Sequence, residues 1–221
     1  MRYILIDMLK VIALIAMLIY HWWFYQFYLH AMPLSNTVEL TGWLARFLFL
    51  FLFGFNFSFS KSKTFKSLVS RLNKLIAAAV LVSVVSYIYQ PSLAIYFGVL
   101  HLFVFSAIVL FFLRTRVSLI LLISSVSVLG FVLPMPSVSF NHLLFLGLHN
   151  TDFASFDYFA FYPYFSFIGF GYWFAHNFKE QLRVDYTSNI YSSLCSFLAR
   201  HSLAIYLLHL PVIVLFDYMW R

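Results

Sequence analysis

Residues 3–28 read YILIDMLKVIALIAMLIYHWWFYQFY. This stretch is longer than the roughly 20 apolar residues that a helix needs to cross a bilayer. It contains Asp7 and Lys10 near its start, and no small-residue cleavage site follows it, so it differs from a secretory signal peptide. We therefore predict that the chain begins with a true membrane-spanning helix.

The same apolar character recurs along the rest of the chain. Six further segments cover residues 41–60, 68–90, 95–113, 117–134, 158–177 and 200–219. The stretch 138–150 is too short to span, and we expect it to be an interfacial or re-entrant piece. The sequence thus predicts an all-α, polytopic membrane bundle of about seven transmembrane helices.

The composition excludes several classes of protein. Hydrophobic residues make up 63% of the 221 residues and charged residues 10%, against about a quarter charged in soluble domains. The aromatic content of 22% excludes a disordered chain. The net charge of +7 would suggest nucleic acid in a soluble protein, but here it predicts membrane topology and no nucleic-acid partner. The single cysteine, Cys195, excludes an internal disulfide and a multi-cysteine metal site.

The basic residues fall in alternate loops. The loops near 29–40, 91–94 and 135–157 contain no lysine or arginine. The loops after the second, fourth and sixth segments contain Lys61, Lys63, Lys66, Arg71, Lys74, Arg114, Arg116, Lys179, Arg183 and Arg200. The positive-inside rule then predicts a cytoplasmic N-terminus and a C-terminus outside.

Three ionisable residues interrupt the first segment, namely Asp7, Lys10 and His21. Each costs roughly 2.5–3.5 kcal/mol at mid-helix, so each needs a partner or a function. At about 100° per residue, Lys10 and His21 share a face, and they lie about 16 Å apart along the axis. One interpretation is an i,i+3 ion pair of Asp7 with Lys10 and an interfacial His21. The other is a polar seam that crosses the membrane.

The last segment has a similar pattern. Ser202, Tyr206 and His209 are spaced i, i+4, i+7 and so line one face, with His209 near mid-depth. Pro211 removes a backbone donor and favours a kink there. Either His209 is a core histidine that hydrogen-bonds between helices, or it lines a polar cavity.

Other polar residues allow two interpretations each. Asp157 can cap its helix or bind a ligand. The basic cluster that includes Arg71 and Lys74 can contact anionic lipid or dock a polyphosphate such as the nucleotide end of coenzyme A. Histidine spacing typical of metal sites is missing from the sequence, so no metal is expected.

Several segments resemble integral-membrane acyltransferases. Residues 2–10 look like the opening shared by these proteins, and Lys10-x10-His21 resembles the R-x10-H motif of the acyltransferase-3 family. Lysine replaces arginine there, and Tyr25 stands where bacterial relatives have aspartate. Bacterial relatives of heparan-α-glucosaminide N-acetyltransferase are similar over residues 46–60, 96–106, 157–171 and 199–211, and ARHSLAIYLLHLP is the most specific of these blocks.

The resemblance implies that residues 1–221 form a single acyltransferase-like domain in the cell (plasma or inner) membrane. It would move an acyl group, expected to be acetyl, from cytoplasmic acyl-CoA to a sugar hydroxyl or amine outside. His21 inherits the catalytic role by position, and His30 is the counterpart of the histidine in the outer loop of the animal enzyme. Lys10 and Arg46 would attract the CoA phosphates or polarise the thioester, and the remaining predicted binding residues are Asp7, Asn56, Arg71, Lys74, His101, Asp157, Tyr206 and His209.

A second class of function is compatible with the same residues. A bundle with a polar seam can be a small transporter or an acyltransferase-like scaffold without catalysis. The expected partners are the lipid bilayer, acyl-CoA, a sugar or glycan acceptor and a second copy of the chain in a homodimer.

Overall fold

The computed structural model describes residues 4–133, 135–182 and 190–219, so Arg2, Tyr3 and Arg183 lie outside the described residues. The chain divides into two compact units, one of residues 1–52 with 178–221 and one of residues 53–177. The single domain expected from the resemblance stays a prediction.

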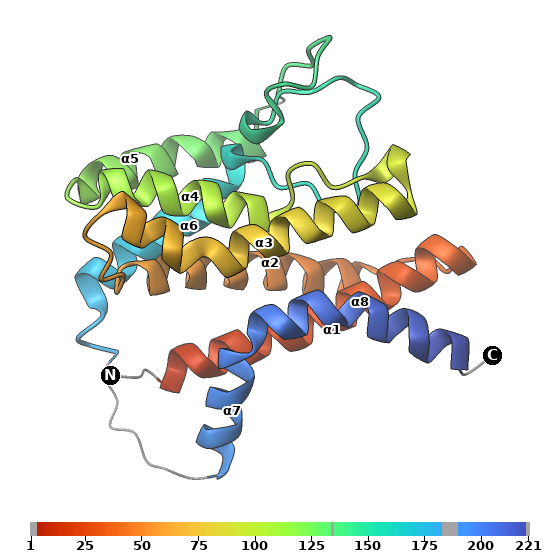
Figure 1. Ribbon diagram of the computed structural model, residues 1–221, viewed down its shortest axis with the longest axis horizontal. Coiled ribbons are helices and arrows are strands. Elements are labelled where there is room, and N and C mark those ends of the chain that lie inside the picture. Colours follow the sequence, from red (N-terminus) through yellow and green to blue (C-terminus); the bar gives the residue numbers. More distant parts are fainter. Residues whose placement is uncertain (1–3, 134, 183–189, 220–221) are drawn as a thin grey trace. The chain divides into compact units, whose positions relative to one another are not determined.

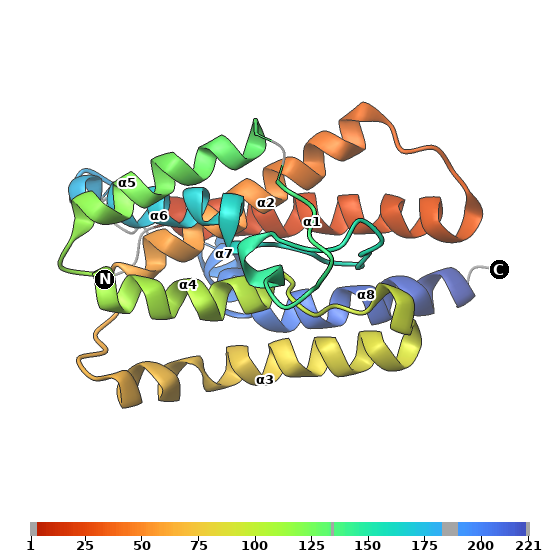
Figure 2. The ribbon, with the colours of Figure 1, turned by 90° about the horizontal axis from the view of Figure 1, so that it is seen from above.

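Helices α1 and α8 form the centre of the first unit (Figure 1). This unit contains α1 (Ile4–His30), α7 (Ile190–Arg200), α8 (Ser202–Met219) and α2 (Asn36–Phe57) as far as residue 52. Figures 1 and 2 both show α1 and α8 side by side and running in the same direction. Leu14 and Met17 of α1 are buried together with Ala45 of α2, and Tyr206 of α8 packs on them. This packing brings the first and last predicted spans into one core.

The second unit contains helices that alternate in direction. These are α3 (Phe65–Tyr89), α4 (Val99–Leu113), α5 (Val117–Val128), α6 (Phe161–Phe178) and the short 3-10 turns η1 (Pro91–Leu93), η2 (Leu129–Phe131) and η3 (Leu144–Leu146). The α6 range contains non-helical backbone at Tyr162. The interfacial piece expected at 138–150 consists of turns and η3.

The basic loops of this unit meet at one end of α4. Arg114 donates from Nη1 to the Ser62 carbonyl at 2.5 Å and from Nη2 to the Lys63 carbonyl at 3.3 Å. At the other end of α4, the Phe156 N–H donates to Leu93 O and the Phe159 N–H to Phe97 O. Loops with and without lysine and arginine therefore gather at opposite ends, as the alternation requires. The orientation in the membrane stays a prediction.

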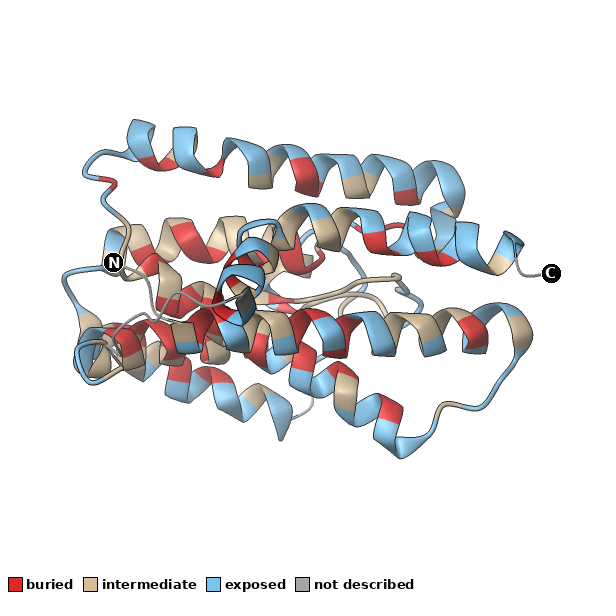
Figure 3. Cartoon of the chain, turned by 90° about the horizontal axis from the view of Figure 1, so that it is seen from below, coloured by how far each residue is buried: buried red, intermediate tan, exposed pale blue. Residues whose placement is uncertain are grey.

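The all-helical, polytopic membrane architecture predicted from the sequence is confirmed. Helices α1, α2, α3 and α8 are each long and apolar enough to cross a bilayer, and α4 and α5 with η2 are shorter apolar helices. Exposed residues recur along the helices (Figure 3), and many are large and apolar, such as Val85 and Ile88 of α3. Such faces suit a lipid environment. The count of seven spans stays a prediction.

Two boundaries differ from those predicted. Helix α4 begins at Val99 rather than near 95, because Gly98 caps it and η1 occupies the preceding segment. Residues 190–200, which we predicted as part of a loop, form α7. This prediction was wrong because α7 is too short to span and contains three serines, so its apolar signal is weak.

Close packing between α2 and α6 depends on Gly54. A Cβ atom at this position would lie 1.8 Å from the Ile168 carbonyl oxygen, which belongs to the backbone and cannot rotate away. We expect Gly54→Ala to lower stability by about 1–3 kcal/mol, the usual cost of overpacking. Thermal unfolding in detergent measures this, with the exposed Ala77→Leu as a control that adds volume without a neighbour to displace. Equal melting temperatures for the Gly54 variant and wild type would contradict this packing.

Candidate functional site

The first unit places a pair of histidines between α1 and α8. The rings of His21 and His209 lie with their centroids 4.5 Å apart at 73°, and His209 is buried. His21 Nδ1 lies 2.9 Å from the Met17 carbonyl, and His209 Nδ1 contacts the Tyr206 carbonyl. A carbonyl only accepts, so each Nδ1 carries the proton and donates it. Each neutral ring therefore keeps an unprotonated Nε2, the atom that can act as a base or nucleophile.

The Nε2 atom of His209 has no hydrogen-bond partner among the described residues. A buried polar atom without a partner costs free energy, and such atoms are rare in native proteins. A ligand that donates an N–H or O–H would satisfy it. The sequence left open whether His209 is a core histidine or lines a cavity, and its role stays a prediction.

A cation lies near this pair. Arg46 of α2 donates from Nη2 to the Tyr20 hydroxyl at 3.4 Å, and its guanidinium lies over the rings of Tyr20 and Trp43 at 5.6 and 5.0 Å. Tyr20 in turn touches His21, with ring centroids 5.4 Å apart. The structure thus links predicted residues Arg46 and His21 through Tyr20, which we did not predict.

A second cluster joins the C-terminal ends of α1 and α8. Asp217 Oδ2 lies 3.6 Å from His30 Nε2, within ion-pair distance, and accepts a hydrogen bond from the Tyr25 hydroxyl at 3.4 Å. The side chains of His30 and Asp217 are 25% and 16% exposed, so a ligand can reach them. We name Tyr25, His30 and Asp217 the C-terminal cluster. A carboxylate beside an imidazole orients the ring and stabilises the imidazolium that forms when the ring takes a proton.

A third cluster lies at the start of α1. Asp7 is buried, pairs with Lys10 at 3.8 Å and accepts a hydrogen bond from the Ser196 hydroxyl of α7 at 3.0 Å. The i,i+3 ion pair predicted between Asp7 and Lys10 is therefore present. Between this cluster and the histidine pair, Leu14 and Met17 form a buried apolar layer. Asp7 and Lys10 thus lie at one level of α1 and His21 at another, with this apolar layer of α1 between them.

Two predicted residues of the second unit, Asp157 and His101, lie at the N-terminus of α4. The Asp157 carboxylate accepts from the Val99 N–H at 3.0 Å. His101 Nδ1 accepts from the Gly98 N–H at 3.2 Å, and its Nε2 lies 3.2 Å from the Ser83 hydroxyl. Both ring nitrogens are therefore engaged at the N-terminus of α4. The capping interpretation of Asp157 holds, although the helix it caps is α4 and not the one that follows it.

This cap gives a prediction. Asp157→Ala is expected to lower stability by about 0.5–2 kcal/mol, whereas Asp157→Asn keeps an oxygen acceptor and most of that stability. Thermal unfolding of the two variants, with CoA binding measured alongside, separates capping from ligand binding. Loss of CoA binding by a stable Asp157→Asn protein would show that the carboxylate does more than cap α4.

The remaining predicted residues lie at the basic end of the second unit or close to it. Arg71 and Lys74 are exposed on α3, and Arg71 Nη1 donates to the Ser60 hydroxyl at 2.8 Å. Asn56 is half-buried in the last turn of α2. Exposed cations beside a basic loop fit either lipid phosphate or a nucleotide, so their role stays a prediction.

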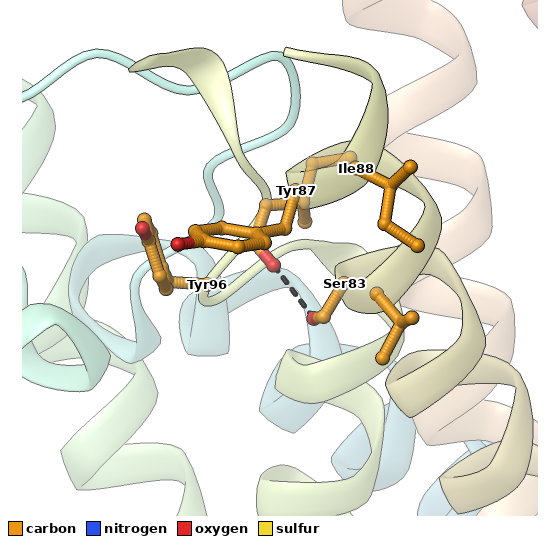
Figure 4. Close-up of a pocket in the computed structure, with 6 residues that line it drawn as sticks. Ser83, Tyr87, Ile88 and Tyr96 are labelled. Carbon is orange, nitrogen blue, oxygen red and sulfur yellow. Dashed lines mark hydrogen bonds between the residues drawn. The ribbon is translucent and has the colours of Figure 1, made fainter. Parts of the chain in front are cut away.

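The same unit has a shallow cavity of about 260 Å³ at the C-terminal end of α3 (Figure 4). Its walls are Ser83, Val84, Tyr87, Ile88, Ile95 and Tyr96. The Ser83 hydroxyl donates to the Ile95 carbonyl at 2.6 Å. Tyr158 is not part of these walls; its hydroxyl donates to the Leu144 carbonyl, and burial raises its pKa to about 12. An apolar notch without a convergent set of polar groups is a poor catalytic site.

Comparison with known protein families adds to this geometry. The family model described as heparan-alpha-glucosaminide N-acetyltransferase, catalytic, matches residues 2–211. The chain belongs to this family. No curated protein and no solved structure matches it.

Membership of the heparan-alpha-glucosaminide N-acetyltransferase family confirms the resemblance noted in the sequence, and it makes the chain a membrane protein of an acetyltransferase family. Neither the family match nor the fold tests which residues act. In the described residues, no three histidine, cysteine, aspartate or glutamate side chains lie together as metal ligands would. Sequence reasoning missed Tyr20, Tyr25, Ser196 and Asp217. A carboxylate near the end of an apolar span is itself a signal, since it is costly without a partner.

Proposed function

We propose that this chain is a transmembrane acetyltransferase that moves an acetyl group from cytoplasmic acetyl-CoA to an amine or hydroxyl of a sugar at the outer face. The proposal rests chiefly on the C-terminal cluster, where Asp217 lies 3.6 Å from His30 Nε2. In the topology predicted from the sequence this cluster lies at the outer face, where the acceptor would bind. The family match supports acetyl as the group transferred.

His30 is the general base of this proposal. Its imidazole takes a proton from the acceptor nitrogen or oxygen while that atom bonds to the thioester carbonyl carbon. The carbon–sulfur bond then breaks, and the departing CoA thiolate recovers the proton from His30. Asp217 stabilises the positive charge on the ring between these two steps. His21 lies beside His209 rather than beside a carboxylate, so taking a proton is less favourable there.

The histidine pair serves the donor. The Nε2 atoms of His21 and His209 accept hydrogen bonds, and the pantetheine arm of CoA offers amide N–H groups. Lys10 lies about 16 Å from His21 along α1, on the path by which the CoA phosphates would enter. The arm would pass the Leu14 and Met17 layer, so these side chains must move when the donor binds.

Acetyl transfer across vesicles tests the proposal. Protein in liposomes receives radiolabelled acetyl-CoA on one side and glucosamine on the other, and we expect labelled N-acetylglucosamine to accumulate. Protein-free liposomes are the control. Absence of both CoA binding and transfer in several lipid mixtures would leave the chain a non-catalytic scaffold or transporter.

A further inference from the structure

Helix α7 has its polar and apolar faces reversed with respect to a water-exposed helix. Ser192 and Ser196 are buried, and the Ser196 hydroxyl donates to Asp7 of α1. The opposite face exposes Tyr191, Leu194 and Phe197 at 76%, 56% and 51%. A helix at a protein surface in water keeps its apolar stripe inward. Contact with water therefore does not explain this face.

The position of α7 indicates what covers it. Helix α7 ends at Arg200 and α8 begins at Ser202, so α7 lies at one end of a helix able to cross the bilayer. Figure 1 shows α7 running across α1 and α8 rather than along them. Where α1 and α8, which are both able to cross a bilayer, do so, a helix transverse to both at their N-terminal ends lies along the membrane surface.

We infer that α7 is an interfacial helix whose face of Tyr191, Leu194 and Phe197 inserts into the phospholipid headgroup layer at the Asp7 end of α1. Amphipathic helices of this kind bury their apolar face about 5–10 Å into the boundary between headgroups and acyl chains. Aromatic side chains favour this depth. Exposed Arg200 lies within about 20° of Ser193 at the edge of the face, placed to meet lipid phosphate.

A lipid surface suits this face better than a second copy of the chain. Three side chains on an eleven-residue helix can bury much less than the about 800 Å² that each partner buries in a stable protein interface. A lipid layer needs no complementary partner, and it is continuous with the surroundings of α8. The polar link between Ser196 and Asp7 fixes which face of α7 points outward.

Site-directed spin labelling of the full chain tests the inference. Leu194→Cys and, as the matched control, Ser193→Cys are made with Cys195→Ser and labelled in phosphatidylcholine–phosphatidylglycerol vesicles. We expect the Leu194 label to be several-fold more accessible to oxygen, relative to a water-soluble nickel chelate, than the Ser193 label. Phe197→Cys gives a second reading on the apolar face if the Leu194 variant folds poorly.

Two results would contradict the inference that α7 is an interfacial helix. Equal nickel accessibility at positions 193, 194 and 197 would place the apolar face in water. Efficient disulfide cross-linking between copies through Leu194→Cys would show that a second chain covers it. Neither readout depends on acetyl transfer, so this test is independent of the proposed function.

Discussion

Replacing His30 by alanine is expected to lower the rate of acetyl transfer by about 10²–10⁴-fold, the usual contribution of a positioned base. The imidazole would be lost from the C-terminal cluster, where Asp217 is its partner at 3.6 Å. CoA binding should stay near that of wild type, because the predicted donor-binding residues, such as Lys10 and His209, do not belong to this cluster. Single-turnover transfer in liposomes and CoA titration measure the two effects.

Variants of the other two residues of the C-terminal cluster test the role of His30 further. Asp217→Asn keeps the size of the side chain but removes the charge that stabilises the imidazolium, so its rate should fall as well. Tyr25→Phe removes one hydrogen bond to Asp217 and should have a smaller effect. His142→Ala, an exposed histidine of the second unit, is the matched control and should keep full activity.

The opposite pattern would reassign the base. Full transfer by His30→Ala, together with inactive but CoA-binding His21→Ala, would place the chemistry at the histidine pair. His21 and His30 were the two alternatives in the sequence. The neighbours that distinguish them, His209 and Asp217, both come from α8 and are distant in the sequence.

The membrane-spanning character was predictable because length and hydropathy decide it locally. The pairing of basic loops was also predictable, since Arg114 meets the Ser62 and Lys63 carbonyls as the alternation of charge requires. The i,i+3 pair of Asp7 with Lys10 follows from helix geometry alone. These features depend on residues close together in the chain or on their side of the membrane.

Tertiary partners were not predictable in the same way. Asp157 caps α4, which begins 58 residues earlier, and Asp217 reaches Tyr25 across 192 residues. No periodicity relates such pairs. Tyr25 shows the consequence, because it stands where bacterial relatives have aspartate and a carboxylate from α8 lies against it. The sequence has no carboxylate at this position, whereas the fold places the Asp217 carboxylate beside Tyr25.

Loss of the ion pair at the start of α1 is expected to have the second large effect, a fall in stability. Asp7→Ala leaves Lys10 without this carboxylate and the Ser196 hydroxyl without its acceptor. Breaking a buried ion pair costs about 3–5 kcal/mol, and the 23% exposure of the Lys10 side chain places this case at the lower end. We expect a lower melting temperature and faster proteolysis near α7.

The double variant Asp7→Ala/Lys10→Leu separates structure from function. Removing both charges also removes the lysine that has lost this carboxylate, so stability should largely return. If Lys10 also attracts the CoA phosphates, the stable double variant will still bind CoA more weakly than wild type. Recovery of both stability and CoA binding would restrict the pair to a structural role, and unchanged stability of Asp7→Ala would show that the pair contributes little to folding. The two readouts thus test the two interpretations of one ion pair separately, because stability responds to the loss of the ion pair and CoA binding to the loss of a cation.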